Sequence, residues 1–89
     1  MRLDKYLKVA RILKRRTVAN ELADNGRVTV NGKVAKPSTA VNPGDVLEVS
    51  FGNRRLTVRV LALETSVKKS EASSLYEVID ELMKLLGED

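Results

Sequence analysis

The sequence predicts an α+β fold in which a pair of short helices packs on a small β-sheet and a further helix follows. Three patterns indicate it: helical spacing of apolar residues before residue 26, alternation between 27 and 60, and renewed helical spacing after 73. A chain of 89 residues supports one modest core. We therefore expect a domain over residues 1–63, a polar linker over 64–73 and an amphipathic helix over 74–87.

Two short helices are predicted to come first. The first has its apolar residues at the spacing i, i+3, i+4, i+7, namely Leu3, Tyr6, Leu7 and Ala10. The second should follow Arg16, with an apolar face formed by Val18, Ala19, Leu22 and Ala23. Thr17 is a candidate cap for its start, and Gly26 suits the left-handed position just past its end.

Strands should follow the helices. Asn31-Gly32 lies inside the alternating stretch RVTVNGKVA and favours a two-residue hairpin turn, because both turn positions need a positive φ. After a loop that contains Pro37 and Pro43-Gly44, the stretch VLEVSF places Leu47, Val49 and Phe51 on one face. A second alternating run, LTVRVLAL, should pair with it across Gly52-Asn53.

The last segment has a helical pattern. Ser74 and Glu77 have the spacing of a capping box, and apolar residues follow at helical spacing: Leu75, Val78, Ile79, Leu82, Met83 and Leu86. Residues 70–89 contain six acidic residues and only one basic residue, Lys84. Such a helix would either dock on the strands or bind in a groove of a partner protein.

The charge distribution points to a polyanion. Residues 1–36 hold ten Lys or Arg and three acidic residues, whereas residues 37–89 hold six and nine. The absence of Cys and His removes disulfides, thiol nucleophiles, a histidine base and most tight metal sites, and no catalytic motif is present. We therefore expect a non-enzymatic protein without metal or cofactor. Without a long apolar run or a signal-peptide pattern, it should be soluble and cytoplasmic.

RNA fits this charge better than the other polyanions. Membrane binding usually requires bulky apolar residues on a long amphipathic helix, and three aromatic residues are too few for a platform that stacks bases. A helix-turn-helix DNA reader is disfavoured because the second helix carries Glu21 and Asp24. Arg15 and Arg16 instead stand at its start, where guanidinium and backbone N–H groups can converge on one phosphate.

Three segments of the chain resemble a known family. RLDKYL, RRTVANELADNGRVTVNG and KPSTAVNPGD are similar to the RNA-binding module of small-subunit ribosomal protein S-four (S4) type, also found at the ends of rRNA pseudouridine synthases and bacterial tyrosyl-tRNA synthetases. The resemblance covers residues 1–60 and implies the S-four-like, or αL-motif, RNA-binding fold. Many members have Ser-Ser-Arg where this chain has Lys14-Arg15-Arg16, so the usual serine cap is missing and two cations are added.

Within the family, the opening MRLDKYLKVARILKRRTVA is similar to stand-alone members of the heat-shock protein fifteen-like subgroup, which bind large ribosomal subunits carrying a stranded peptidyl-tRNA. The resemblance implies a factor that contacts rRNA and tRNA in ribosome-associated quality control and assists a partner that adds alanine to the nascent chain. We expect the protein to be monomeric. Three alternatives stay open: a recycling factor of the large subunit, a targeting module of an rRNA-modifying enzyme, and a structural ribosomal protein.

The resemblance also implies the site residues. Arg2 and Arg16 are the first candidates for rRNA and tRNA contacts, and Asp4 should orient a neighbouring arginine or cap the first helix. Asn31 and Gly32 serve the turn. The further RNA-binding candidates are Lys5, Lys8, Arg11, Lys14, Arg15, Arg27, Lys33 and Lys36.

Overall fold

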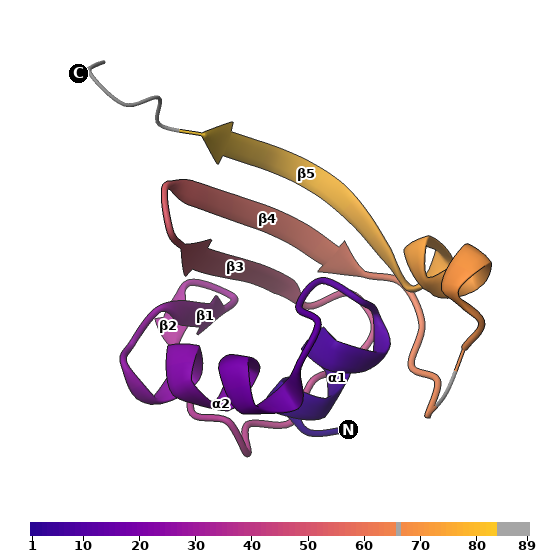
Figure 1. Ribbon diagram of the computed structural model, residues 1–89, viewed down its shortest axis with the longest axis horizontal. Coiled ribbons are helices and arrows are strands. Elements are labelled where there is room, and N and C mark those ends of the chain that lie inside the picture. The colour runs from indigo at the N-terminus through magenta and orange to yellow at the C-terminus, as the bar shows by residue number, and fades with distance from the viewer. Residues whose placement is uncertain (66, 84–89) are drawn as a thin grey trace.

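The computed structural model describes residues 1–65 and 67–83. Two helices cover one face of a five-stranded antiparallel sheet with the strand order β2-β1-β3-β4-β5 (Figure 1). The elements are α1 (Leu3–Val9), α2 (Arg16–Asp24), β1 (Val28–Val30), β2 (Lys33–Val34), β3 (Val46–Phe51), β4 (Arg54–Val60), a 3-10 helix η1 (Lys69–Leu75) and β5 (Tyr76–Met83). The predicted α+β class, with a helix pair on a sheet, is confirmed.

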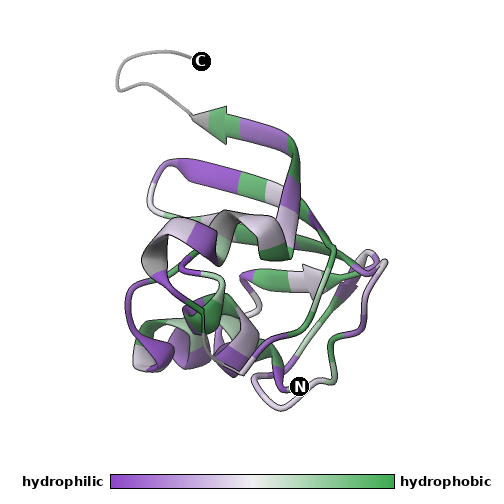
Figure 2. Cartoon of the chain, turned by 90° about the vertical axis from the view of Figure 1, so that its right-hand side faces the viewer, coloured by the Kyte–Doolittle hydropathy of each residue, from purple (hydrophilic) through white to green (hydrophobic). Residues whose placement is uncertain are grey.

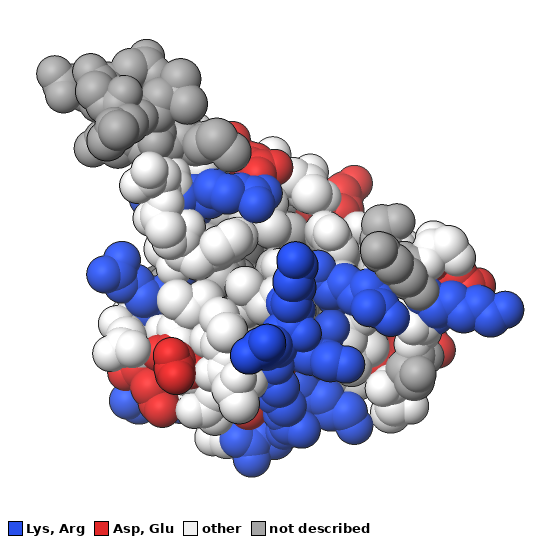
Figure 3. Space-filling model, in the orientation of Figure 1, with Lys and Arg blue, Asp and Glu red and all other residues white. Residues whose placement is uncertain are grey.

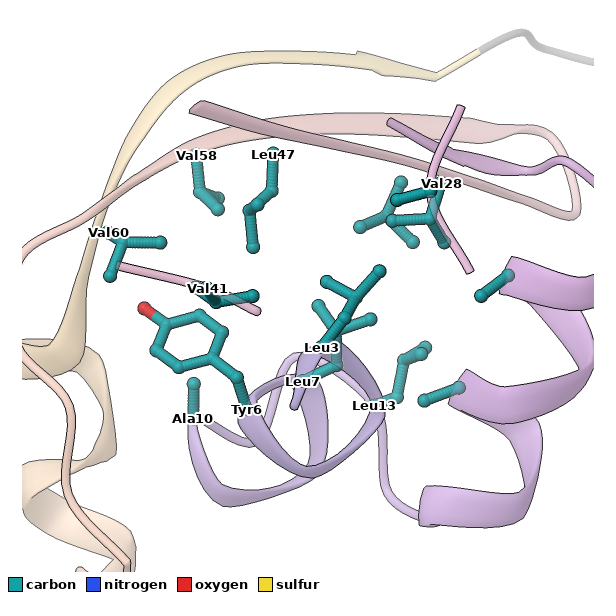
Figure 4. Packing of buried hydrophobic residues seen from close by; sticks show 14 of the residues in the cluster. Leu3, Tyr6, Leu7, Ala10, Leu13, Val28, Val41, Leu47, Val58 and Val60 are labelled. Carbon is teal, nitrogen blue, oxygen red and sulfur yellow. The ribbon is translucent and has the colours of Figure 1, made fainter. Parts of the chain in front are cut away.

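The core lies between the helices and the inner strands. The predicted apolar face of α1 is confirmed, and Figure 4 shows its side chains directed at residues of β1, β3 and β4. In α2 the buried face is narrower than predicted: Ala19 and Ala23 are buried, whereas Val18 is 40% exposed. The alternation of the strands is confirmed as well, since Leu47 and Val49 of β3 and Leu56 and Val58 of β4 are buried.

The predicted hairpin turn at Asn31-Gly32 is present between β1 and β2. Asn31 has a φ of 52° and Gly32 a φ of 85°, as the turn requires. The Asn31 side chain also binds the start of β3: its Oδ1 accepts from the Val46 N–H at 2.9 Å, and its Nδ2 donates to Asp45 Oδ1 at 3.1 Å. Asn31 therefore serves the turn and fixes the sheet at the same time.

The start of α2 differs from the prediction. The helix begins at Arg16, its N-cap residue is Arg15, and no side chain among residues 1–65 and 67–83 caps it. Thr17 cannot act as the cap because it lies inside the first turn, where its own φ and ψ are helical. The predicted end is confirmed, because Gly26 follows the helix with a φ of 74°.

The predicted C-terminal helix is wrong over the described residues. Ser74 belongs to η1 and donates to the Glu71 carbonyl, and residues 76–83 form β5 along the outer edge of β4. This pairing satisfies the backbone of the β4 edge and joins Arg59 to Glu77 and Arg54 to Glu81, so tertiary context overrides the local pattern. Residues 84–87 of the predicted helix lie outside the described residues.

The segment that precedes β5 contributes to the core. Leu75 is 1% exposed and Ala72 is 4% exposed. The sequence instead predicts Ala72 in a polar linker and Leu75 in a separate helix. In β5, hydrophobic and hydrophilic residues are mixed (Figure 2), and Val78, Ile79 and Leu82 are about half exposed. The apolar spacing that resembles a helix thus belongs to a strand whose side chains are mostly exposed.

Tyr6 connects α1 to this segment. Its hydroxyl, raised in pKa mainly by burial and also by the nearby Tyr76, stays protonated and donates to the Leu75 carbonyl at 2.7 Å. We expect Tyr6→Phe to lower the free energy of unfolding by about 1 kcal/mol and Tm by about 4 to 8 °C, because the carbonyl still accepts from the Leu61 and Ala62 N–H groups.

Thermal unfolding followed by circular dichroism measures the effect of Tyr6→Phe. Tyr76→Phe is the matched control, because the Tyr76 hydroxyl has no hydrogen bond within residues 1–65 and 67–83. Equal Tm values for both variants would show that the Tyr6 hydrogen bond contributes nothing.

Candidate nucleic-acid interface

A buried carboxylate lies between two exposed arginines. The Asp4 side chain is only 3% exposed, whereas the side chains of Arg2 and Arg16 are 50% and 47% exposed. Arg2 donates from Nε to Asp4 Oδ1 at 3.2 Å and from Nη2 to Oδ2 at 3.3 Å, and Arg16 donates from Nη2 to Oδ1 at 3.3 Å. Each guanidinium has five N–H groups, so both keep donors for an acceptor from outside.

Two further donors complete the surroundings of Asp4. The Lys5 backbone N–H donates to Oδ1 at 2.8 Å, and Asn20 Nδ2 donates to Oδ2 at 3.4 Å. Burial by itself raises the pKa of Asp4, but the hydrogen bonds from Arg16, Arg2 and Asn20 outweigh it and hold the pKa below its ordinary value. The carboxylate is therefore ionised at neutral pH and fixes both guanidinium groups.

Backbone contacts set the position of α1. The N–H groups of Leu3 and Asp4 donate to the carbonyls of Thr39 and Pro37, and Arg2 forms an isolated β-bridge with Ala40. The start of α1 is thereby fixed on the loop that carries residues 37–41. This arrangement places Asp4 against the first turn of α2, where Arg16 and Asn20 share one face at a spacing of four residues.

The site is a shallow hollow of about 500 Å³. It lies between the start of α1 and the first half of α2, and its lining residues are Arg2, Asp4, Arg16, Thr17, Asn20 and Glu21. Because no side chain in the described part of the protein caps α2, the N–H groups of its first turn can also face an incoming anion. An oxyanion in this hollow would meet two guanidiniums and a helix N-terminus.

A second group of predicted residues gathers at the other end of α1. Lys8, Arg11 and Lys14 line a hollow of about 340 Å³ together with Leu13. Figure 3 shows Lys and Arg side chains in a continuous band over α1 and the segment that leads to α2. Arg15 is exposed in the same segment, whereas Lys5 is half-buried. Most of the predicted residues therefore lie on one surface.

Three predicted residues lie elsewhere or only beside this surface. Arg27 lines a different hollow, at the C-terminal end of α2 near Phe51 and Gly52. Lys33 is exposed on β2, at the far edge of the sheet. Lys36 is exposed and directly precedes Pro37, whose carbonyl accepts from the Asp4 N–H, so its backbone lies beside the site.

Sequence reasoning missed Asn20 as part of this site. The sequence pattern assigns Asn20 no role, whereas in the structure its amide donates to the Asp4 carboxylate that binds both arginines. The spacing of four residues between Arg16 and Asn20 is the signal that places the two side chains on one helix face. Only the fold shows that Asp4 lies opposite that face.

The fold and this surface define a class of protein: a small module that presents lysine and arginine side chains to nucleic-acid phosphates. The comparison with family models assigns the family, because residues 1–47 match the model of the S4 domain. The chain belongs to the S4 domain family. This confirms the resemblance seen in the sequence.

Relatives of known name match over nearly the whole chain. The chain is 51% identical over 88 residues to the "RQC P-site tRNA stabilizing factor" of Bacillus subtilis, covering 99% of this chain and 100% of that protein. It is 57% identical over 81 residues to the protein of the same name from Streptococcus pneumoniae, covering 91% and 92%. These names support a role in ribosome-associated quality control.

A solved structure shares the fold. Heat shock protein 15 of Vibrio cholerae, described as trimeric, superimposes with a TM-score of 0.82 at 33% identity, covering 88% of this chain and 80% of that one. Separately, no helix within the described residues is long and apolar enough to cross a membrane.

Proposed function

We propose that the protein is a non-catalytic RNA-binding factor that binds the large ribosomal subunit carrying peptidyl-tRNA and contacts both rRNA and tRNA. The observation that carries the proposal is the pair of half-exposed arginines held by Asp4, next to the cations of the α1–α2 segment. Such a surface fits the phosphates of folded RNA, which is recognised largely by shape. The candidate contacts remain Arg2 and Arg16 first, with the surrounding Lys and Arg residues.

The relatives make the proposal more specific. Proteins called P-site tRNA stabilizing factors of ribosome-associated quality control match nearly the whole chain at more than half identity. We therefore assign this chain an RqcP-like role: it would hold tRNA on an obstructed large subunit while a partner, RqcH, adds alanine residues to the nascent chain. This work takes place in the cytoplasm, where ribosomes translate.

A second candidate is a recycling factor of the heat-shock protein fifteen type, favoured by the fold similarity to the Vibrio cholerae protein. Both candidates bind obstructed large subunits, so binding alone does not separate them. Alanine tailing does, because only the first candidate supports it.

Reconstitution tests the proposal. Purified large subunits with peptidyl-tRNA, RqcH and alanyl-tRNA are incubated with and without the protein, and the length of the alanine tail is measured. We expect longer tails with the protein, and tighter binding to subunits that carry tRNA than to empty ones, because a second RNA is then contacted. Equal binding to both kinds of subunit and unchanged tails would reject the proposal, whereas preferential binding with unchanged tails would favour the recycling factor.

A further inference from the structure

The end of α1 has an unusual residue at its turn. The Arg11 N–H donates to the Lys8 carbonyl and the Ile12 N–H donates to the Leu7 carbonyl, which is the hydrogen-bond pattern of a Schellman motif. In this motif Arg11 occupies the left-handed position, and its φ is 58°. Glycine is the usual residue there because a Cβ atom is strained at positive φ. The chain thus has an arginine at a position where glycine would make the turn, and with it the folded protein, more stable.

Neither helix electrostatics nor ion pairing accounts for this arginine. A cation near the C-terminus of α1 is favourable, but Lys8 in the last turn already provides one. Arg11 forms no ion pair within residues 1–65 and 67–83, and the hollow it lines is shared with Lys8 and Lys14, two further cations. In the free protein this group combines backbone strain with like-charge repulsion. A bound anion would relieve the repulsion.

The shape of the group suits an anion. The hollow of about 340 Å³ is much larger than the share of about 30 Å³ that one water takes in the liquid, so it has room for a phosphate group. Leu13, which is 7% exposed, contributes the apolar part of the lining. Arg11, at the left-handed turn, lines the hollow together with Lys8 of the helix and Lys14 of the following segment.

We infer that Lys8, Arg11 and Lys14 form a second phosphate-binding site for the RNA backbone, separate from the site around Asp4, and that arginine occupies the left-handed turn for this purpose. The inference rests on the proposed RNA-binding function. Strained backbone is commonly found at functional sites, where the surrounding structure holds it. Here the surrounding structure is the pair of hydrogen bonds to the carbonyls of Leu7 and Lys8.

Arg11→Gly removes both the backbone strain and the charge, and two measurements report the two effects separately. We expect Tm to rise by about 2 to 5 °C. Glycine relieves the strain at positive φ, but it also raises the conformational entropy of the unfolded chain, which offsets part of the gain. Binding to large subunits carrying peptidyl-tRNA should weaken, and the slope of log K against log salt should shrink by about 0.7 to 0.9 for each phosphate that the variant no longer neutralises. Arg11→Ala should reduce the slope equally without the gain in Tm.

Two other variants serve as controls for the loss of charge and for the proposed function. Arg55→Ala removes one exposed cation from β4, whose register places it opposite Ser50 and Leu82, and should leave the slope unchanged. Arg16→Ala tests the proposed function itself. A normal slope in Arg11→Gly beside a reduced slope in Arg16→Ala would overturn the inference alone, and normal slopes in both would overturn the proposed function. A Tm that does not rise in Arg11→Gly would overturn the argument from strain.

Discussion

Replacing Asp4 by asparagine will lower the free energy of unfolding by about 1 to 3 kcal/mol, which corresponds to a fall in Tm of about 4 °C or more. The change removes a buried carboxylate that accepts from two guanidiniums, an amide and a backbone N–H. Asparagine has nearly the same shape, but one of its two terminal groups becomes a donor. That group would face arginine donors with which it cannot form a hydrogen bond.

The pH dependence of this destabilisation follows from the lowered pKa of Asp4. A carboxyl group whose pKa is lower in the folded than in the unfolded protein binds fewer protons when folded, so it stabilises the fold above its ordinary value of 3.8. This contribution disappears as the pH falls through the folded pKa. The stability difference between the wild type and Asp4→Asn should therefore be full at neutral pH and shrink below about pH 3.8.

Denaturant unfolding at several pH values measures the Asp4 contribution. Asp24→Asn is the control, because Asp24 is exposed at the C-terminal end of α2 and should change the stability by less than about 0.5 kcal/mol. A difference between wild type and Asp4→Asn that is the same at pH 7 and pH 2 would contradict the role given to the carboxylate.

Arg16→Ala is expected to weaken binding to tRNA-bearing large subunits by about 10- to 100-fold, because a hydrogen bond to a charged group contributes about 1.5 to 3 kcal/mol. The salt slope should shrink by about 0.7 to 0.9 for each phosphate that is no longer neutralised. The fold should survive, since the Arg16 side chain is 47% exposed and Asp4 keeps Arg2, Asn20 and the Lys5 N–H as donors.

Arg16→Lys and Arg55→Ala complete this comparison. Lysine keeps the charge but lacks the planar fork that can hold Asp4 and a phosphate together, so it should recover only part of the affinity. Arg55→Ala removes the same charge from β4 and should bind as the wild type does. An unfolded Arg16→Ala protein, or one with the wild-type salt slope, would contradict the assignment of Arg16.

Local features made most of the fold predictable. The face of α1, the Asn31-Gly32 turn and the alternation of β3 and β4 are each encoded within a few residues, so periodicity and turn chemistry were sufficient. The segment after Ser74 was mispredicted because its state depends on a distant element: the open edge of β4 and the arginines Arg54 and Arg59 on it. The spacing of apolar residues within a segment gives no information about a distant strand edge with which that segment can pair.

The candidate site was likewise predictable only in part. The charge asymmetry and the family resemblance indicated Arg2 and Arg16 from the sequence. The sequence also suggested that Asp4 orients a neighbouring arginine. That Arg2 and Arg16 share this carboxylate could not be deduced from spacing, because Arg16 reaches Asp4 only when α1 packs against α2. Positive charge at the start of α2 opposes the helix dipole. Asp4 offsets part of this cost in the free protein, and a bound phosphate would offset more.

Ultraviolet crosslinking in cells, followed by identification of both the peptide and the RNA, shows which surface of the protein binds RNA and which RNA it binds. Cleavage after glutamate yields residues 1–21 as one peptide, separate from 22–48 and 49–64, so α1 and the first part of α2 are distinguished from the strands. We predict crosslinks from residues 1–21 to large-subunit rRNA and to tRNA. Crosslinks confined to the sheet peptides, or only to small-subunit rRNA or mRNA, would contradict it.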